Sequence, residues 1–131
     1  MAIGESVSEY HYVFISPGRP RERLLSDISY ACGVDLRSAS SEFVDYSANL
    51  GYAAVEVELS HEYEEAYGIP FEAYDSLLAV RDFGSDLVRQ ENLARAIFRN
   101  LASLERYSLA LVLDLQVLLD SAIPRQGPGS G

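Results

Sequence analysis

The alternation of apolar and polar side chains is strongest near the C-terminal end of the chain, from Tyr107 to Leu119. Every odd position in this stretch is apolar, which is the period-two pattern of a β-strand with one buried face. In its first half the even positions Ala110 and Val112 are apolar too, which indicates burial on both faces, as in the middle of a sheet. The stretch therefore predicts one strand around which a sheet is built.

Three further segments, 10–16, 52–59 and 76–83, are rich in β-branched, aromatic or alternating residues and predict strands. Two other segments repeat apolar residues at the helical period. The first, 20–32, has Pro20 in its first turn and Gly33 as its stop. The second, 86–104, begins after Ser85 or Asp86, either of which can cap a helix.

The segment 34–50 carries mixed signals. Residues 34–36 fit a short strand, and residues 41–50 fit either a strand or a short helix. We favour a strand-like or irregular conformation around residues 42–46.

This order of elements predicts an α+β fold, with two helices on one face of a four- to five-stranded, mostly antiparallel sheet. The closest common arrangement is ferredoxin-like. Both helices then cover the same face, and Glu56 and Glu58, which alternate with buried valines, are expected on the open face. We predict a flexible leader over residues 1–8, a single domain over 9–120 and a flexible Gly/Pro-rich tail over 121–131.

Charge is distributed unevenly along the chain. The net charge is -10, with 20 acidic residues against 10 basic ones, all of them Arg. The segment 38–80 contains nine of the acidic residues and no basic residue. This balance argues against nucleic acid or an anionic membrane as a direct partner and favours a basic protein. A solvated acidic face that serves solubility alone is the simpler interpretation.

The sequence contains only weak motifs for metal binding and catalysis. Residues 61–65, HEYEE, contain metal-ligating side chains, but they lack the second His of a zinc motif and the spacing of a calcium loop. Cys32 falls on the apolar face of the first helix and is predicted to be a small core residue. Asp82 and Asp114 form a conceivable carboxylate pair, for which structural roles are the simpler explanation. We therefore expect no cofactor, no metal and no catalytic residue.

The strand YAAVEVEL, the loop HEYEE and the acidic residues through Asp75 give the chain a build and charge that resemble immunity proteins of bacterial polymorphic and contact-dependent toxin systems. This resemblance extends over about a third of the chain. It implies a small cytosolic protein that neutralises a basic toxin, commonly a nuclease, by covering its active site. The predicted partner-binding residues are Glu56, Glu58, His61, Glu62, Tyr63, Glu64, Glu65, Tyr67, Glu72 and Asp75.

Two alternatives remain open at this point. In the first alternative, the chain is a small ferredoxin-like enzyme or ligand-binding domain that uses the open sheet face around His61. In the second, it is a module that forms a homodimer through an exposed edge strand. A cytoplasmic location is expected, because the N-terminus lacks a secretory pattern, no run of apolar residues is long enough to span a membrane, and there is a single cysteine.

Overall fold

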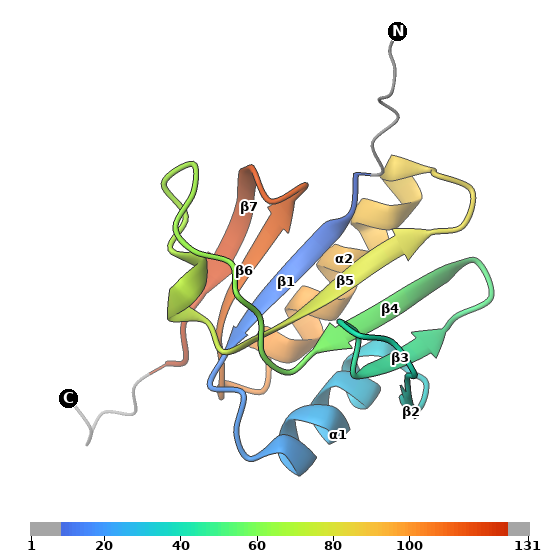
Figure 1. The fold of residues 1–131 in the computed structure, drawn as a ribbon, viewed down its shortest axis with the longest axis horizontal. Coiled ribbons are helices and arrows are strands. Elements are labelled where there is room, and N and C mark those ends of the chain that lie inside the picture. Colours follow the sequence, from blue (N-terminus) through green and yellow to red (C-terminus); the bar gives the residue numbers. More distant parts are fainter. Residues whose placement is uncertain (1–8, 126–131) are drawn as a thin grey trace, which may run out of the picture.

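One antiparallel sheet dominates the computed structural model, which describes residues 9–125 (Figure 1). Its strands lie in the order β2-β3-β4-β5-β1-β6-β7. Two helices, α1 (Arg21–Cys32) and α2 (Leu87–Ala102), cover one face of it (Figure 1). The strands are β1 (His11–Ser16), β2 (Arg37–Ser38), β3 (Tyr46–Asn49), β4 (Ala53–Glu58), β5 (Ser76–Asp82), β6 (Ser108–Leu113) and β7 (Val117–Ala122).

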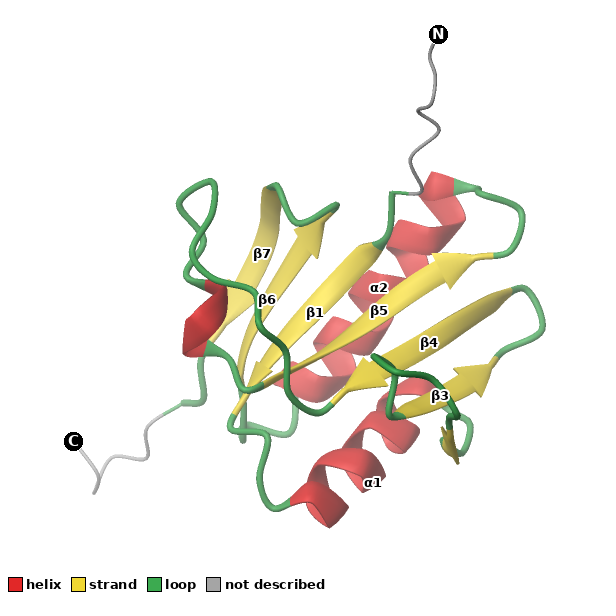
Figure 2. Cartoon of the chain, viewed as in Figure 1, coloured by secondary structure: helices red, strands yellow, loops and turns green. Residues whose placement is uncertain are grey.

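The predicted four- to five-stranded, ferredoxin-like sheet is wrong, because the sheet has seven strands. The α+β class and the placement of both helices on one face agree with the prediction (Figure 2). The extra strands extend both edges of the sheet. On one side, β2 and β3 arise from the ambiguous segment 34–50, where β3 pairs with β4 and β2 pairs with β3. On the other side, β7 pairs with β6.

The stretch 107–119 is a hairpin rather than one strand. The chain turns after Leu113 through Asp114 and Leu115, whose φ angles are 56° and 58°. Such turns usually contain Asn or Gly, which tolerate positive φ, so this Asp-Leu pair gave no turn signal. The alternation of apolar residues continues past the turn because β7 is itself a strand with the same period. β7 extends through Ala122, two residues into the segment that we predicted to be a tail. Burial of Ala110 and Val112 confirms that β6 is covered on both faces.

Both helices begin and end where local chemistry predicts. Pro20 precedes α1, and Gly33 ends it with a φ of 78°. The carboxylate of Asp86 accepts a hydrogen bond from the backbone N–H of Arg89 at 3.0 Å and so caps α2. The helices pack on the sheet over the main core, which includes Val13, Ile15, Leu24, Ile28, Val55, Val57, Leu78, Val80, Ile97, Leu101, Leu109 and Leu111.

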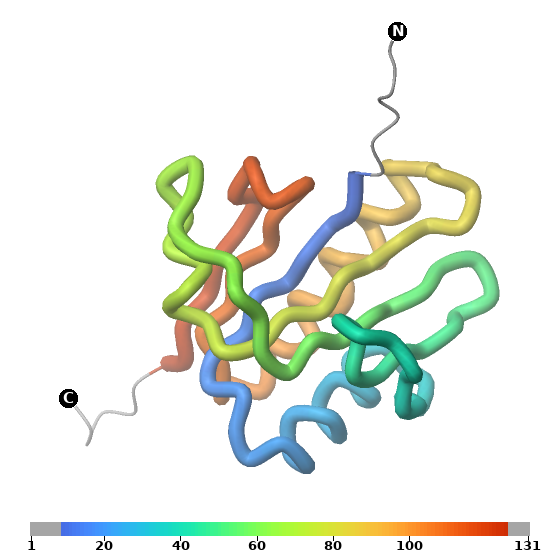
Figure 3. The backbone as a smooth tube through the Cα atoms, in the orientation of Figure 1, coloured from blue at the N-terminus to red at the C-terminus, as the bar shows by residue number. Residues whose placement is uncertain are grey.

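A long loop between β4 and β5 crosses the other face of the sheet (Figure 3). It contains a short 3₁₀ helix, Phe71–Ala73. Phe71 is 2 % exposed, and its ring centroid lies 4.6 Å from that of Phe14 on β1. The members of this second core are Phe14, Ile69, Phe71, Leu77, Ala110 and Val112. The helix-free face is therefore partly covered, contrary to the prediction that it is open.

Glu56 and Glu58 lie on this second face, as predicted. Their neighbours Val55 and Val57 belong to the main core under the helices, so the intervening side chains of β4 point to the opposite side. The predicted leader, residues 1–8, lies outside the described residues, as do residues 126–131 of the predicted tail.

Candidate functional site

His61 fixes the start of the long loop. Its Nε2 lies 2.7 Å from the carbonyl oxygen of Tyr74, and its Nδ1 lies 3.1 Å from the backbone nitrogen of Tyr63. A carbonyl accepts and an N–H donates, so Nε2 carries the proton and Nδ1 is an acceptor. The ring also meets Phe14 edge to face, with centroids 5.2 Å apart. Burial lowers the pKa of His61, which favours this neutral form.

This arrangement counts against the enzyme or ligand-binding alternative around His61. Both ring nitrogens are engaged with the protein itself, so His61 presents no free lone pair to a metal or to a substrate proton. Within residues 9–125, no group of three or more His, Cys, Asp or Glu side chains is placed to hold a metal ion. His61 thus acts as a structural link between the two ends of the loop.

A hollow of 740 Å³ lies on one side of the His61–Tyr63 segment. Its walls come from the loop and from Gly18 and Arg19, which precede α1. The acidic residues that line it are Glu62, Glu64, Glu72 and Asp75.

A second hollow, of 510 Å³, lies on the other side of the same segment. It adds Glu42, Asp45 and Glu58, together with the ring of Phe43, which is 70 % exposed. Residues 60–63 line both hollows, so the two are adjacent. We call them together the acidic double hollow.

The carboxylates of the second hollow lie close enough to influence one another. The pKa of Glu58 is raised by burial and further by the carboxylates of Asp45 and Glu56. Both effects disfavour the charged form of Glu58, and a cation placed beside its carboxylate would favour that form.

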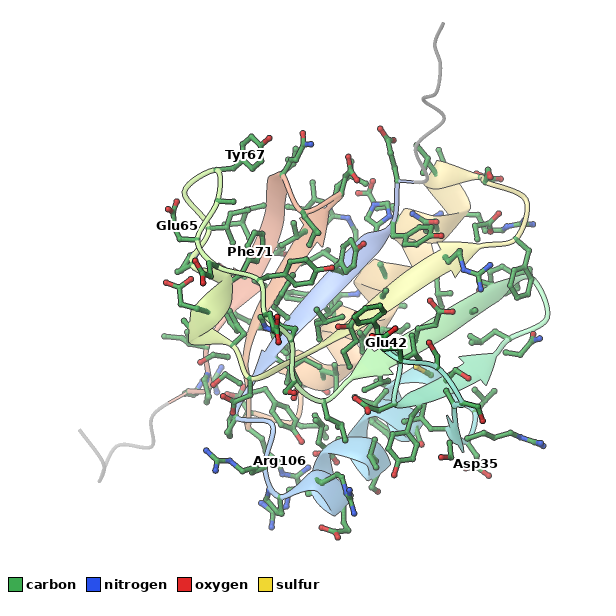
Figure 4. All side chains as sticks on the ribbon, in the orientation of Figure 1. Asp35, Glu42, Glu65, Tyr67, Phe71 and Arg106 are labelled. Atoms are coloured by element: carbon green, nitrogen blue, oxygen red, sulfur yellow. The ribbon has the colours of Figure 1, made fainter. Side chains whose placement is uncertain are left out.

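The structure brings most of the predicted partner-binding residues together. Glu58, His61, Glu62, Tyr63, Glu64, Glu72 and Asp75 line the acidic double hollow. Three others do not. Glu56 points to Arg81 on β5, with 3.2 Å between the two side chains. Glu65 and Tyr67 lie at the far end of the loop, away from Glu42 (Figure 4).

Sequence reasoning missed Glu42, Phe43 and Asp45 as members of the site, although the two acids were counted in the acidic segment. Asp45 accepts a hydrogen bond from the backbone N–H of Leu59 at 2.8 Å, which fixes segment 42–45 beside the end of β4. The signal available in the sequence was the acidic run itself. It could not show that the residues before β3 approach the loop after β4.

The acidic residues of the segment divide into two groups by what they contact. Asp45, Glu56, Glu65 and Asp75 each accept a hydrogen bond from the protein, the last from the backbone N–H of Gly18 at 2.8 Å. The carboxylates of the second group, which we call the unpaired group, make no hydrogen bond or ion pair with any residue that the structure describes. Its members are Glu42, Glu58, Glu62, Glu64 and Glu72.

The remaining candidates from the sequence have structural roles. Asp82 is buried and accepts two hydrogen bonds from the guanidinium of Arg89, at 2.7 and 3.0 Å. These bonds hold its pKa well below the usual range, so it is a fixed anion rather than half of a catalytic pair with Asp114. Burial raises the pKa of the Cys32 thiol to about 12, which leaves it protonated and unreactive.

Comparison with protein-family models, curated proteins and solved structures finds no match for this chain. Within the described residues, neither helix combines the length and the apolar character needed to cross a bilayer.

Proposed function

We propose that this chain binds a basic protein through the acidic double hollow and neutralises it, in the manner of a toxin-immunity protein acting in the bacterial cytosol. The observation that carries the proposal is the convergence of carboxylates from two separate segments, 42–45 and 58–75, around the shared residues 60–63.

The chemistry of the double hollow suits arginine and lysine side chains. Unpaired carboxylates such as Glu62 and Glu64 are free to form charge-assisted hydrogen bonds, which are about twice as strong as neutral ones. Phe43 and Tyr63 provide exposed aromatic faces on which a guanidinium can stack. A field of one sign over the surface also raises the rate of encounter with an oppositely charged protein.

Rigidity supports the same proposal. The rings of His61 and Phe71 both contact Phe14 on β1, so the loop that carries Glu62 and Glu64 is held to the sheet before a partner arrives. Preorganisation of this kind reduces the entropy that binding must offset. A flexible acidic loop that served solubility alone would not require such anchoring.

Affinity capture tests the proposal. The immobilised chain is exposed to lysate of the source organism at low salt and then washed with a salt gradient. We expect a specific basic protein to elute at intermediate salt, and adding the chain to that purified protein should abolish its toxic activity. If the captured protein retains its activity when saturated, or if only non-specific basic proteins are recovered, the proposal fails.

A further inference from the structure

The side chain of Gln90, in the first turn of α2, bridges two strands of the sheet. β1 and β5 pair with His11 opposite Val80. The same register places Glu9 opposite Asp82, and here the Gln90 amide lies between the two backbones. Its Oε1 accepts from the N–H of Asp82 at 2.9 Å, and its Nε2 donates to the carbonyl of Glu9 at 2.8 Å. We call this arrangement the Gln90 bridge, which extends the pairing of the two strands beyond the start of β1.

The bridge determines which nitrogen of His11 carries the proton. Its two backbone bonds fix the orientation of the amide, because an N–H must meet the amide oxygen and a carbonyl must meet the amide nitrogen. That nitrogen also lies 2.8 Å from Nδ1 of His11, so Nδ1 accepts and the neutral ring is protonated at Nε2. His11 is 1 % exposed, and its Nε2 makes no hydrogen bond with any residue among 9–125.

Glu91, next to Gln90 on α2, lies near this unbonded nitrogen. Its Oε1 is 3.8 Å from Nε2 of His11, which is too long for a hydrogen bond, and its Oε2 accepts from Arg95 at 2.7 Å. A movement of about 1 Å would bring Glu91 into bonding distance of the ring. Such a bond is stronger when the ring is charged, because both partners are then ions.

We propose that His11 is a proton-operated switch between these two neighbours on α2. When the ring is neutral, Nδ1 accepts from Gln90 and the bridge is closed. A second proton enters at Nδ1, where it faces the N–H of Gln90. Turning the amide over would set its oxygen against the carbonyl of Glu9 and its nitrogen against the N–H of Asp82. Protonation therefore expels Gln90 from its place between the strands, while the charged ring pairs with Glu91 through Nε2.

The surroundings keep the bridge closed at neutral pH. Burial lowers the pKa of His11 from 6.5, and Arg95 acts in the same direction, while Glu91 and Glu9 act against them. Val80 and Leu113, opposite His11 on β5 and β6, are uncharged. The charged residues around His11 and the bridge are Glu9 before β1, Asp82 on β5 with its partner Arg89, and Glu91 and Arg95 on α2. In the open form the ring is hydrated and its pKa is higher, so the open form gains population as the pH falls below 6.5.

The switch is independent of the proposed function. Asp82 at the end of β5 pairs with Ala53, whereas Glu58 of the acidic double hollow pairs with Leu77 at the start of β5. The two sites are therefore at opposite ends of the same strands. The bridge instead borders a separate hollow of 360 Å³, which gives water a route to it. The starts of β1 and α2 lie together at this end of the sheet (Figure 1).

Nuclear magnetic resonance of the full chain tests the switch, with the Asp82 amide as reporter because its N–H bonds to Gln90. Hydrogen exchange is measured from about pH 7.5 to about pH 5 and corrected for the intrinsic exchange rate. We expect the protection of this amide to fall below pH 6.5, by up to about tenfold for each pH unit. The next amide, Phe83, donates to the carbonyl of Tyr52 instead and should keep its protection.

Two variants assign the effect to the ring. His11→Leu cannot be protonated, so protection of the Asp82 amide should not depend on pH. Glu91→Gln removes a carboxylate that favours the charged ring, so the loss of protection should move to lower pH. Constant protection in the wild type overturns the proposal, and an equal fall in His11→Leu overturns the assignment to His11. The ring nitrogens of the wild type give a check without a variant, because a protonation midpoint that differs from the midpoint of amide exposure also overturns it.

Discussion

His61 and Tyr74 are joined by a hydrogen bond of 2.7 Å, from the ring Nε2 to the backbone oxygen, that closes the long loop between β4 and β5 on itself. The two residues are 13 positions apart in the chain. This bond places the start of the loop beside its end, and the edge-to-face contact of the His61 ring with Phe14 on β1 holds the start of the loop to the sheet. The backbone that carries Glu62 and Glu64 follows directly from this anchored residue.

We expect His61→Ala to destabilise the loop because it removes both hydrogen bonds of the ring and its contact with Phe14. A lost hydrogen bond costs about 0.5–1.5 kcal/mol, so the total should be roughly 1–3 kcal/mol. Chemical denaturation measures this loss. Glu62→Gln, one residue away, is the control and should be nearly neutral, because the Glu62 side chain makes no hydrogen bond or ion pair within residues 9–125. A stable His61→Ala variant would show that the ring does not hold the loop.

Stability should fall as the pH decreases below about 6.5, the ordinary pKa of histidine. Burial lowers the pKa of both His11 and His61, so the unfolded chain binds protons that the folded chain refuses. The stabilising contribution is therefore complete above 6.5 and is lost as the pH falls toward the lowered values. His11 lies beside Glu91, Arg95 and Glu9, of which the two carboxylates partly oppose the effect of burial.

Urea denaturation between about pH 7.5 and about pH 5.5 measures this dependence. Replacement of both histidines by asparagine should flatten the slope over that interval, even though it lowers stability as a whole. An equally steep slope in the double variant would assign the effect to other groups.

Phe71→Ala should release the loop from the sheet. Phe71 is the largest loop side chain in the second core, and truncation of a buried phenylalanine costs about 3–5 kcal/mol when the surroundings cannot collapse. We expect limited proteolysis to cut within residues 59–75 of the variant and not of the wild type. Exposed Phe43→Ala provides the control and should leave the loop protected. Resistance of both variants to cleavage would show that Phe71 is not the anchor.

Tyr107→Phe should destabilise the junction between α1 and β6. The Tyr107 hydroxyl donates a hydrogen bond of 2.5 Å to Asp27, whose carboxylate also accepts from Arg106. Loss of a bond to a charged group costs about 1.5–3 kcal/mol. Tyr12→Phe should change the free energy of unfolding little, because the Tyr12 hydroxyl makes no hydrogen bond with any residue among 9–125. Similar values for both variants would contradict the role assigned to this bond.

Local patterns predicted the elements whose signals are confined to short segments. Both helices follow from apolar periodicity and from the caps Asp86 and Gly33, and four strands follow from alternation. The hairpin of β6 and β7 was missed because Asp114 and Leu115 adopt positive φ without the usual Asn or Gly. The total number of strands was therefore underestimated.

The candidate site was only partly predictable for a different reason. The acidic run and its residues 58–75 are visible in the sequence, but the hollows depend on contacts between distant segments. Asp45 meets Leu59, and Gly18 meets Asp75, 57 positions away. No local pattern encodes such contacts. The second core around Phe14 likewise required knowledge of where the loop crosses the sheet.

The most direct test of the proposed function compares three forms of the chain for affinity toward the captured basic protein, at low and high salt. The first is the wild type, the second carries Glu62→Gln and Glu64→Gln, and the third carries Glu22→Gln and Asp35→Asn, which change the charge equally outside the double hollow. We predict that the second form alone loses at least tenfold in affinity, with a weaker salt dependence. Equal affinity for all three forms would contradict recognition through the acidic double hollow.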